Sequence, residues 1–258
     1  MTRYIRSLIF FSATAALVFG SRVFAQAPLA VQPLAQIPQK PAQPIADLLK
    51  AHKVWAGPPS SIQITGTSTR GNVTGPIKIT ATFKEETLTE YGTDKEILTA
   101  SRNFRDDGTK ITPQSTPSGF MQLDITGVFM LAQLMTRPVT TALLETTTVQ
   151  GAKALRVRVR GGRSEIHYRQ IPVNDEFDLY ISESGLLAGI SRSFYESMPR
   201  FKFTQGATFS DYRDTNGVLL PYRIERYLKG YKFETIIVDS YAVNIPAAPT
   251  LFEPRRLP

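Results

Sequence analysis

The sequence predicts a mainly β (α+β) fold: a curled antiparallel sheet that forms an open half-barrel, with one or two helices covering its concave face. Segments in which apolar and polar residues alternate recur about every 8–12 residues, and turns rich in glycine separate them. Helical periodicity is confined to two segments, one at the start of the domain and one near its middle. A sheet of this many strands is expected to curl, because strands twist relative to their neighbours.

The N-terminus has the features of a cleaved Sec-type secretory signal over residues 1–25. Arg3 and Arg6 form a basic region, Leu8–Phe19 is an apolar run, and small residues precede a cleavage position after Ala25. The apolar run has about 12 residues, whereas a membrane-spanning helix needs about 20, which disfavours an uncleaved anchor. The paired arginines of a twin-arginine signal are missing. The predicted localisation is therefore periplasmic.

The chain contains no cysteine. The sequence therefore predicts a protein without lipidation and without disulfides, although the compartment is oxidising. Residues 26–44 hold five prolines among alanine and glutamine, and they predict a disordered tether. Residues 45–258 are long enough to bury a core and are expected to form one domain.

The formal net charge is +8, and three of the arginines lie in the predicted signal. An excess of this size favours anionic membrane surfaces or acidic ligands. No basic helix or aromatic RNA-binding motif is present, so a nucleic acid partner is not expected.

The first predicted helix spans Ile45–Ala56, and Gly57-Pro58-Pro59 ends it. Ile45, Leu48, Leu49 and Trp55 share one face, which predicts that the helix lies against the sheet.

Alternation with a period of two begins at Ser61, which predicts a sheet with one apolar and one wet face. Ile62, Ile64 and Gly66 alternate with polar residues, and the same pattern runs from Ile77 to Phe83. It continues through the segments Thr87–Tyr91 and Glu96–Arg102, with a hairpin turn expected at Asp107-Gly108.

The second predicted helix runs from Asp124, a capping residue, to Arg137, and Pro138 stops it. Its apolar residues cover more than a single stripe. A core helix is the more common case, and a lid over an apolar cavity is the alternative, because methionine-bearing surfaces adapt to varied apolar partners.

The second half of the chain predicts further short strands and then a β-meander. The meander consists of a strand that ends near Arg213, a strand Val218–Leu228 and a strand Tyr231–Val243, with Asn216-Gly217 as a hairpin turn. The strands before it are expected at Leu143–Val149, Ala154–Arg160, Glu165–Gln170, Glu176–Ser182, Leu186–Tyr195 and Arg200–Phe209.

The end of the chain resembles the LolA-like superfamily. The resemblance rests on the run Asp211–Pro221, on Ile-Val-Asp-Ser-Tyr-x-Val-Asn-Ile-Pro up to Pro246, and on Leu-Phe-Glu-Pro up to Pro254. The superfamily holds periplasmic lipoprotein carriers, outer-membrane lipoprotein-sorting proteins and the sensor domain of the sigma-E regulator. The resemblance implies the same half-barrel with helices over its concave face, and it implies lipid binding more than any particular cargo.

The sequence shows no catalytic constellation, so an enzyme is not predicted, and neither a cofactor nor a metal is expected. His52 and His167 lack the spacing of metal ligands. A nucleophile elbow of the Gly-x-Ser-x-Gly type is missing. A hydrolase is the weakest hypothesis, because it would need one of these histidines beside a carboxylate and a hydroxyl.

The leading hypothesis is a periplasmic carrier or binding protein for an amphiphile, either a lipid or the acyl chain of a lipoprotein. Burial stabilises by about 0.8 kcal/mol per CH₂, so one acyl chain is a sufficient ligand. The predicted lining residues are Ile64, Ile79, Phe83, Leu179, Ile190, Leu220, Tyr222, Ile224 and Val238, with Phe129, Leu131 and Met135 on the lid.

The alternative from another class is a non-catalytic envelope sensor or interaction domain. It would dock a membrane protein through its convex surface or a sheet edge. An apolar hollow would distinguish the carrier from a docking module that is packed solid. A monomer is expected in either case.

Overall fold

The computed structural model describes residues 43–53, 59–82, 86–99, 103–113, 127, 129, 139–161, 167–168, 171–172, 176–195 and 202–254. They all lie in one structural unit, Pro38–Pro258. The predicted signal and most of the predicted tether lie outside the described residues. Within the described part of the chain, no helix is long and apolar enough to cross a membrane.

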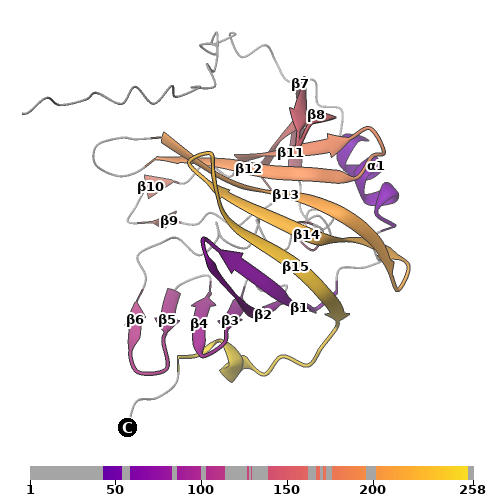
Figure 1. Cartoon of the computed structure of the whole chain (residues 1–258). Helices are drawn as coiled ribbons and strands as arrows, with labels where there is room; N and C mark the ends of the chain where they lie inside the picture. Colours follow the sequence, from indigo (N-terminus) through magenta and orange to yellow (C-terminus); the bar gives the residue numbers. More distant parts are fainter. Residues whose placement is uncertain are drawn as a thin grey trace, which may run out of the picture. The chain divides into compact units, whose positions relative to one another are not determined.

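Thirteen antiparallel strands form one sheet, in the order β6-β5-β4-β3-β2-β1-β15-β14-β13-β12-β11-β8-β7 (Figure 1). The predicted fold class, a mainly β fold whose curled antiparallel sheet forms an open half-barrel, is confirmed, because β6 and β7 remain as two edges. A separate pair consists of β9 (His167–Tyr168) and β10 (Ile171–Pro172). The strands of the sheet are β1 (Ser61–Arg70), β2 (Val73–Thr82), β3 (Thr87–Tyr91), β4 (Asp94–Leu98), β5 (Asn103–Asp106), β6 (Ile111–Pro113), β7 (Val139–Val149), β8 (Ala152–Gly161), β11 (Glu176–Ser182), β12 (Leu187–Tyr195), β13 (Lys202–Thr215), β14 (Val218–Leu228) and β15 (Tyr231–Val243).

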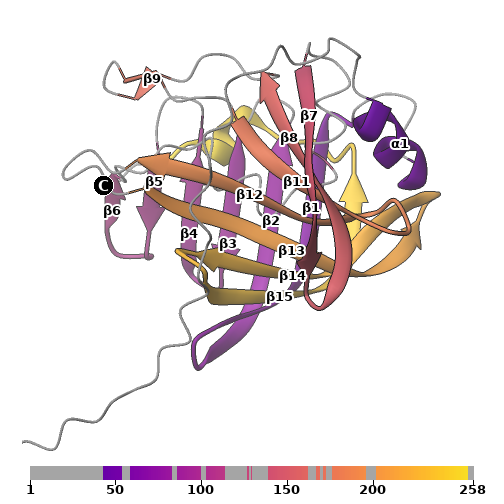
Figure 2. The ribbon, with the colours of Figure 1, turned by 90° about the horizontal axis from the view of Figure 1, so that it is seen from above.

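The sheet curls so that its two halves face each other. Figure 2 shows strands β1 to β4 lying behind strands β12 to β15 and crossing them at a steep angle. The main hydrophobic cluster joins residues from both halves, among them Ile64 and Ile79 with Leu179 and Ile190. We call the side that carries this cluster the inner face of the sheet.

The C-terminal meander has the predicted strand bounds for both β14 and β15. Asn216 and Gly217 both have positive φ, as the predicted hairpin turn requires. The strand before them differs from the prediction, because β13 runs unbroken from Lys202 to Thr215. Asp211 has a φ of 55° and is left out of the pairing with β14, but the register is the same on both sides of it, so one long strand continues where two segments were expected.

The first third of the sheet also departs from the prediction in detail. Strand β4 spans Asp94–Leu98, earlier than the predicted Glu96–Arg102, and residues 100–102 lie outside the described part. Gly92 has positive φ, so the hairpin turns directly after β3 and brings Asp94 into pairing with Tyr91. The hairpin at Asp107-Gly108 is confirmed between β5 and β6.

The N-terminal helix α1 spans Gln43–Ala51, so its predicted end at Ala56 is wrong. Lys53 has a φ of 51°, and this left-handed residue stops the helix. Ile45, Leu48 and Leu49 are buried against the main cluster as predicted. Trp55 lies outside the described residues.

Two described residues represent the predicted central helix. Gly127 and Phe129 are both helical, and Phe129 is 3% exposed within the main cluster. A Cβ on Gly127 would lie 2.6 Å from the ring of Phe209, so this position packs tightly on β13. The other residues of this segment lie outside the described part.

A smaller cluster lies under the C-terminus. Leu88 of β3 and Ile97 of β4 pack against Phe252, which belongs to a 3₁₀ helix at Pro249–Phe252. The Leu-Phe-Glu-Pro motif therefore covers apolar residues of the first sheet half.

Replacing Gly66 with alanine is expected to lower the free energy of unfolding by about 1–3 kcal/mol, as overpacking does in closely packed interiors. Gly66 lies at a register shift between β1 and β15, and an added Cβ would lie 2.2 Å from the backbone oxygen of Ile237. Urea denaturation would measure the loss. Gly75→Ala on β2 is the matched control, since nothing lies within 4 Å of its Cβ position. Equal stability of the two variants would contradict this account of Gly66.

Candidate functional site

The predicted lining residues mostly gather on the inner face. Seven of them are buried in the main cluster, and Tyr222 packs against it. Leu220 is also buried but belongs to a small cluster with Val218. Phe83, Leu131 and Met135 lie outside the described residues. Their role in binding a ligand stays a prediction. The seven are Ile64, Ile79, Phe129, Leu179, Ile190, Ile224 and Val238.

The inner face changes from apolar to polar towards one end of the strands. Arg226 lies two residues beyond Ile224 on β14, and Glu234 lies two residues before Ile236 on β15. Side chains two apart in a strand share a face, so both project inward. Ser68 on β1 and the cross-strand neighbours Arg192 and Gln205 continue this inner polar row, and all are at most 8% exposed.

An ion pair without solvent exposure lies at the centre of the inner polar row. Arg226 Nη1 donates to Glu234 Oε2, and both side chains are 0% exposed. Ser68 Oγ donates to Glu234 Oε1 at 2.6 Å, and Arg70 Nε donates to the same oxygen at 2.9 Å. Burial would raise the pKa of Glu234, but the attraction of Arg226 and Arg70 and these hydrogen bonds outweigh it and lower the pKa.

A pocket of about 410 Å³ opens beside this ion pair. Its walls come from β1, β2, the β3–β4 hairpin and β5, and none of the nine described residues predicted to line a cavity is among them. Its lining residues are Ser68, Arg70, Val73, Gly75, Pro76, Tyr91, Gly92, Asp94, Glu96 and Arg105.

The side chain of Arg70 is held in this pocket by Tyr91 and Glu234. Its guanidinium stacks over the ring of Tyr91, with 3.8 Å from Cζ to the ring centroid, and Nη2 donates to the Tyr91 hydroxyl. Burial raises the pKa of Tyr91, so the phenol stays neutral. Arg105 Nη2 donates to Asp94 Oδ2 at 2.9 Å, and Arg70 Nη1 lies 3.7 Å from Glu96 Oε1. The pocket thus presents charges of both signs.

Sequence reasoning missed these polar residues, although a signal was present. The predicted inward phase of Ile224 and Val238 also places Arg226 and Glu234 inward, because all four share the alternation of their strands. A buried charge of each sign at adjacent inward positions predicts an ion pair.

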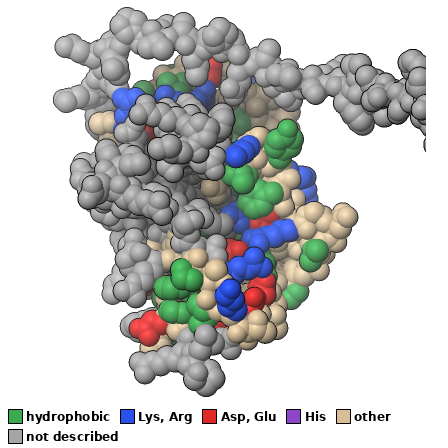
Figure 3. Space-filling model, turned by 90° about the vertical axis from the view of Figure 1, so that its left-hand side faces the viewer, with side chains coloured by type: hydrophobic (Ala, Val, Ile, Leu, Met, Phe, Trp, Pro, Cys, Tyr) green, Lys and Arg blue, Asp and Glu red, His purple; other side chains and the backbone are tan. Residues whose placement is uncertain are grey.

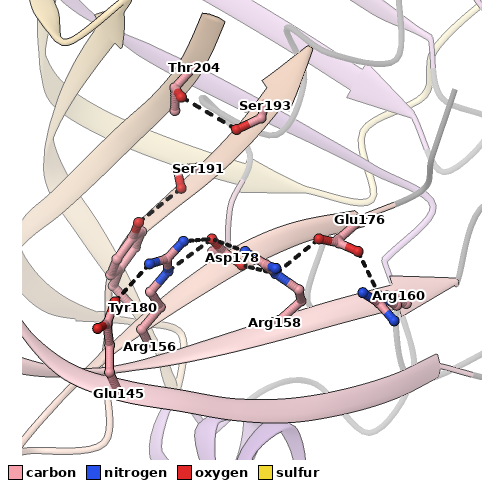
Figure 4. Close-up of polar contacts among 10 residues, drawn as sticks. All are labelled: Glu145, Arg156, Arg158, Arg160, Glu176, Asp178, Tyr180, Ser191, Ser193 and Thr204. Atoms are coloured by element: carbon pink, nitrogen blue, oxygen red, sulfur yellow. Dashed lines mark hydrogen bonds and ion pairs between the residues drawn. The ribbon is translucent and has the colours of Figure 1, made fainter. Parts of the chain in front are cut away.

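A second set of charges covers the outer face. Arg156, Arg158 and Arg160 alternate along β8 and bind the carboxylates of Asp178 and Glu176 on β11 (Figure 4). Asp178 accepts from Arg156 Nη2 at 2.6 Å and from Arg158 Nε at 2.9 Å. This ladder stabilises the pairing of two strands, as opposite charges across a sheet do. Figure 3 likewise shows basic and acidic side chains interspersed on another side of the molecule.

His52 is a fixed, neutral residue of the core. Its Nε2 accepts from the Leu187 amide at 2.9 Å, so Nδ1 carries the proton and donates to the Leu219 oxygen at 2.8 Å. Burial lowers its pKa, against the raising effect of the bond to Leu219. Both ring nitrogens thus tie α1 to β12 and β14. The His167 backbone pairs with Pro172, and its side chain lies outside the description. Among the described residues, no three side chains of the metal-binding types gather.

Comparison with known proteins finds similarity in structure only. No family model matches the chain, and no curated protein matches it in sequence. A domain from Vibrio parahaemolyticus named for outer membrane lipoprotein sorting has a TM-score of 0.48 at 10% identity, covering 81% of this chain and 94% of that one. A DUF1329 family protein from Desulfovibrio piger has a TM-score of 0.49 at 11% identity, covering 81% of this chain and 95% of that one. A LolA superfamily protein from Nitrosomonas europaea has a TM-score of 0.47 at 8% identity, covering 81% of this chain and 97% of that one.

Proposed function

We propose that this protein is a periplasmic, non-catalytic binding protein or carrier for an amphiphile, either a lipid or the acyl chain of a lipoprotein. One observation carries the proposal: the inner face of the curled sheet consists of an apolar zone that ends at a charged pocket. An amphiphile has the same two parts in the same order. Burying its chain removes apolar surface from water, which stabilises by about 0.8 kcal/mol per CH₂.

The chain of the ligand would lie along the apolar zone formed by Ile64, Ile79, Ile224 and Val238. These four side chains are at most 3% exposed and share their cluster with Phe129, so a ligand chain can bind only where the packing of this cluster opens. The head of the ligand would remain at the pocket beside Arg70, where polar groups find partners.

The alternative function is docking of an envelope membrane protein. The observation in its favour is β7, an edge strand of eleven residues on which Leu143 and Leu144 are 62% and 40% exposed. An extended segment of a partner could pair with such an edge. The monomeric state stays a prediction under both functions.

Native mass spectrometry distinguishes the two functions. The protein would be expressed from its full sequence in a Gram-negative host and purified without detergent. A stoichiometric lipid adduct, identified after organic extraction, is expected. A clean apo mass, together with no uptake of a fluorescent fatty acid, would overturn binding of an amphiphile and leave docking as the function to test.

Val238→Phe is expected to lower lipid capture about tenfold, because the larger ring fills the apolar zone. Ile237→Phe is the matched control: Ile237 is the neighbouring residue, it points to the other face, and it is 41% exposed. Overpacking could lower the stability of the first variant by about 1–3 kcal/mol, so thermal unfolding of both would be recorded and capture measured well below either midpoint. Equal lipid capture by the two folded variants would show that the ligand does not bind on the inner face.

A further inference from the structure

We propose that the charged pocket recognises a zwitterionic head group with a phosphate and a primary ammonium, as in a phosphoethanolamine lipid. This inference rests on the proposed function, since it names the head of the amphiphile whose chain the apolar zone would hold. It starts from the pocket lining, in which Arg70 and Arg105 face Asp94 and Glu96. Two cations and two anions leave the lining without net formal charge.

The arrangement of these charges suits a ligand that carries both signs. Asp94 and Glu96 are two residues apart on β4, so they share a face. In the strand register, Glu96 lies opposite Arg105 of β5, so Arg105 is on this face too. The arginine–carboxylate pairs are partly open to water, with exposed side-chain fractions from 22% to 55%. Ion pairs this exposed contribute little to stability, so a ligand can replace them at small cost. A purely anionic head group would meet the carboxylates without compensation.

The phosphate would bind at Arg70, which is the anchored cation. Glu234 holds Arg70 Nε at 2.9 Å, and Tyr91 supports the plane of the guanidinium from one side. Glu234 is itself fixed by the buried Arg226, so the position of Arg70 is set from inside the core. A planar guanidinium held in this way is suited to phosphate oxygens.

The ammonium would bind at Asp94 and Glu96, and the pocket selects a primary amine over a quaternary one. A primary ammonium donates three hydrogen bonds, which two carboxylates can accept. A quaternary ammonium donates none and is recognised by open aromatic faces. The aromatic ring of this pocket, Tyr91, is already stacked by Arg70. Phosphoethanolamine is therefore expected to bind better than phosphocholine.

Competition among lipids with identical chains tests the inference. The detergent-free protein would be mixed with vesicles containing equal amounts of dioleoyl phosphatidylethanolamine, phosphatidylcholine and phosphatidylglycerol, and captured lipid would be quantified. Phosphatidylethanolamine is expected to be enriched about tenfold over each of the others, the ratio that one charge-assisted contact of about 1.4 kcal/mol provides. The double variant Asp94→Asn/Glu96→Gln should lower this enrichment to about twofold or less, because the amides no longer offer charged acceptors to the ammonium.

Glu90→Gln is the matched control for the double variant. Glu90 lies on β3 next to Tyr91 but alternates to the opposite face, where it pairs with Lys78 and Lys95. Enrichment by this variant should equal that of the unchanged protein. If the double variant does not fold, its loss of preference says nothing about the pocket. The competition with the unchanged protein then decides the inference, because it needs no substitution.

The outcomes separate the inference from the proposed function. Equal capture of the three lipids, or enrichment of phosphatidylcholine or phosphatidylglycerol, overturns the head-group site while amphiphile binding stands. Capture of no lipid overturns the proposed function. Glycerophosphoethanolamine, which has the head group without acyl chains, would be tested alone by calorimetry. If it binds as tightly as the lipid, the pocket is a site for a soluble zwitterion and the acyl chain contributes nothing to binding.

Discussion

Replacing Glu234 with alanine is expected to lower the free energy of unfolding by about 3–5 kcal/mol, the cost of breaking a buried ion pair by removing one partner. The substitution leaves the Arg226 guanidinium, which is 0% exposed, without its carboxylate. It also takes the acceptor from Ser68 and Arg70, so three donors lose a charged acceptor at once. Urea denaturation of the purified variant would measure the loss from the shift of the midpoint.

Glu145→Ala serves as the control for Glu234→Ala. Glu145 also pairs with an arginine, with Arg156 Nη1 at 2.7 Å, but its side chain is 56% exposed. The expected loss there is below about 1 kcal/mol, because exposed ion pairs are weak. Similar losses for both variants would show that the pair at Glu234 does not behave as a buried one.

The Glu234 carboxyl also makes the free energy of unfolding depend on pH. The pKa of Glu234 is lower in the folded protein than the ordinary value of 4.5, so the unfolded chain binds its proton first. Its contribution is therefore complete above about pH 4.5 and is lost as the pH falls through the folded pKa. In Glu234→Ala this part of the acid sensitivity should be missing.

Replacing His52 with alanine is expected to lower the free energy of unfolding by about 3 kcal/mol or more. The imidazole is 0% exposed and bonds the backbone of two strands, so its removal leaves the Leu187 amide and the Leu219 oxygen without this partner. Each unsatisfied buried group costs about 1–3 kcal/mol, and the cavity adds to that loss. Thermal or urea unfolding would measure it.

Lys53→Ala is the control beside His52, since its side chain is 61% exposed. A pH series adds a second test. Burial keeps His52 neutral by lowering its pKa, whereas the unfolded chain titrates near 6.5. Stability should therefore be complete above about pH 6.5 and should fall as the pH drops below it. A slope between pH 6.5 and 5 that is the same in His52→Ala would contradict this assignment.

The C-terminal meander could be predicted from the sequence because local chemistry determines it. Asn216-Gly217 and Lys229-Gly230 supply the positive φ values of two hairpins, so the bounds of β14 and β15 follow from their turns. The end of α1 could not be predicted in this way. Lys53 adopts a left-handed conformation where neither glycine nor asparagine marks it, and His52 draws the chain towards β12 and β14.

The inward position of the apolar residues could be predicted from the sequence, whereas their role in binding a ligand stays a prediction. Alternation assigned Ile64, Ile79, Ile224 and Val238 to one face, and the structure buries them together. The charged half depends on contacts across distant strands. Arg70 meets Glu234, 164 residues later in the chain, and such a pairing follows only from the order of the strands in the sheet.

The place of β1 in this order also governs how the chain can fold. β1 lies at the middle of the sheet and pairs with β15, so Ser61 bonds to Ile245 across 184 residues. Closing so long a loop costs entropy before any contact rewards it, and folding dominated by such pairings is slow. As the chain emerges from its N-terminus, β1 can form a hairpin with β2, but its other edge has no partner until β15 emerges. Until then the nascent chain exposes an isoleucine-bearing edge that can template aggregation, and any truncation before β15 would make that exposure permanent.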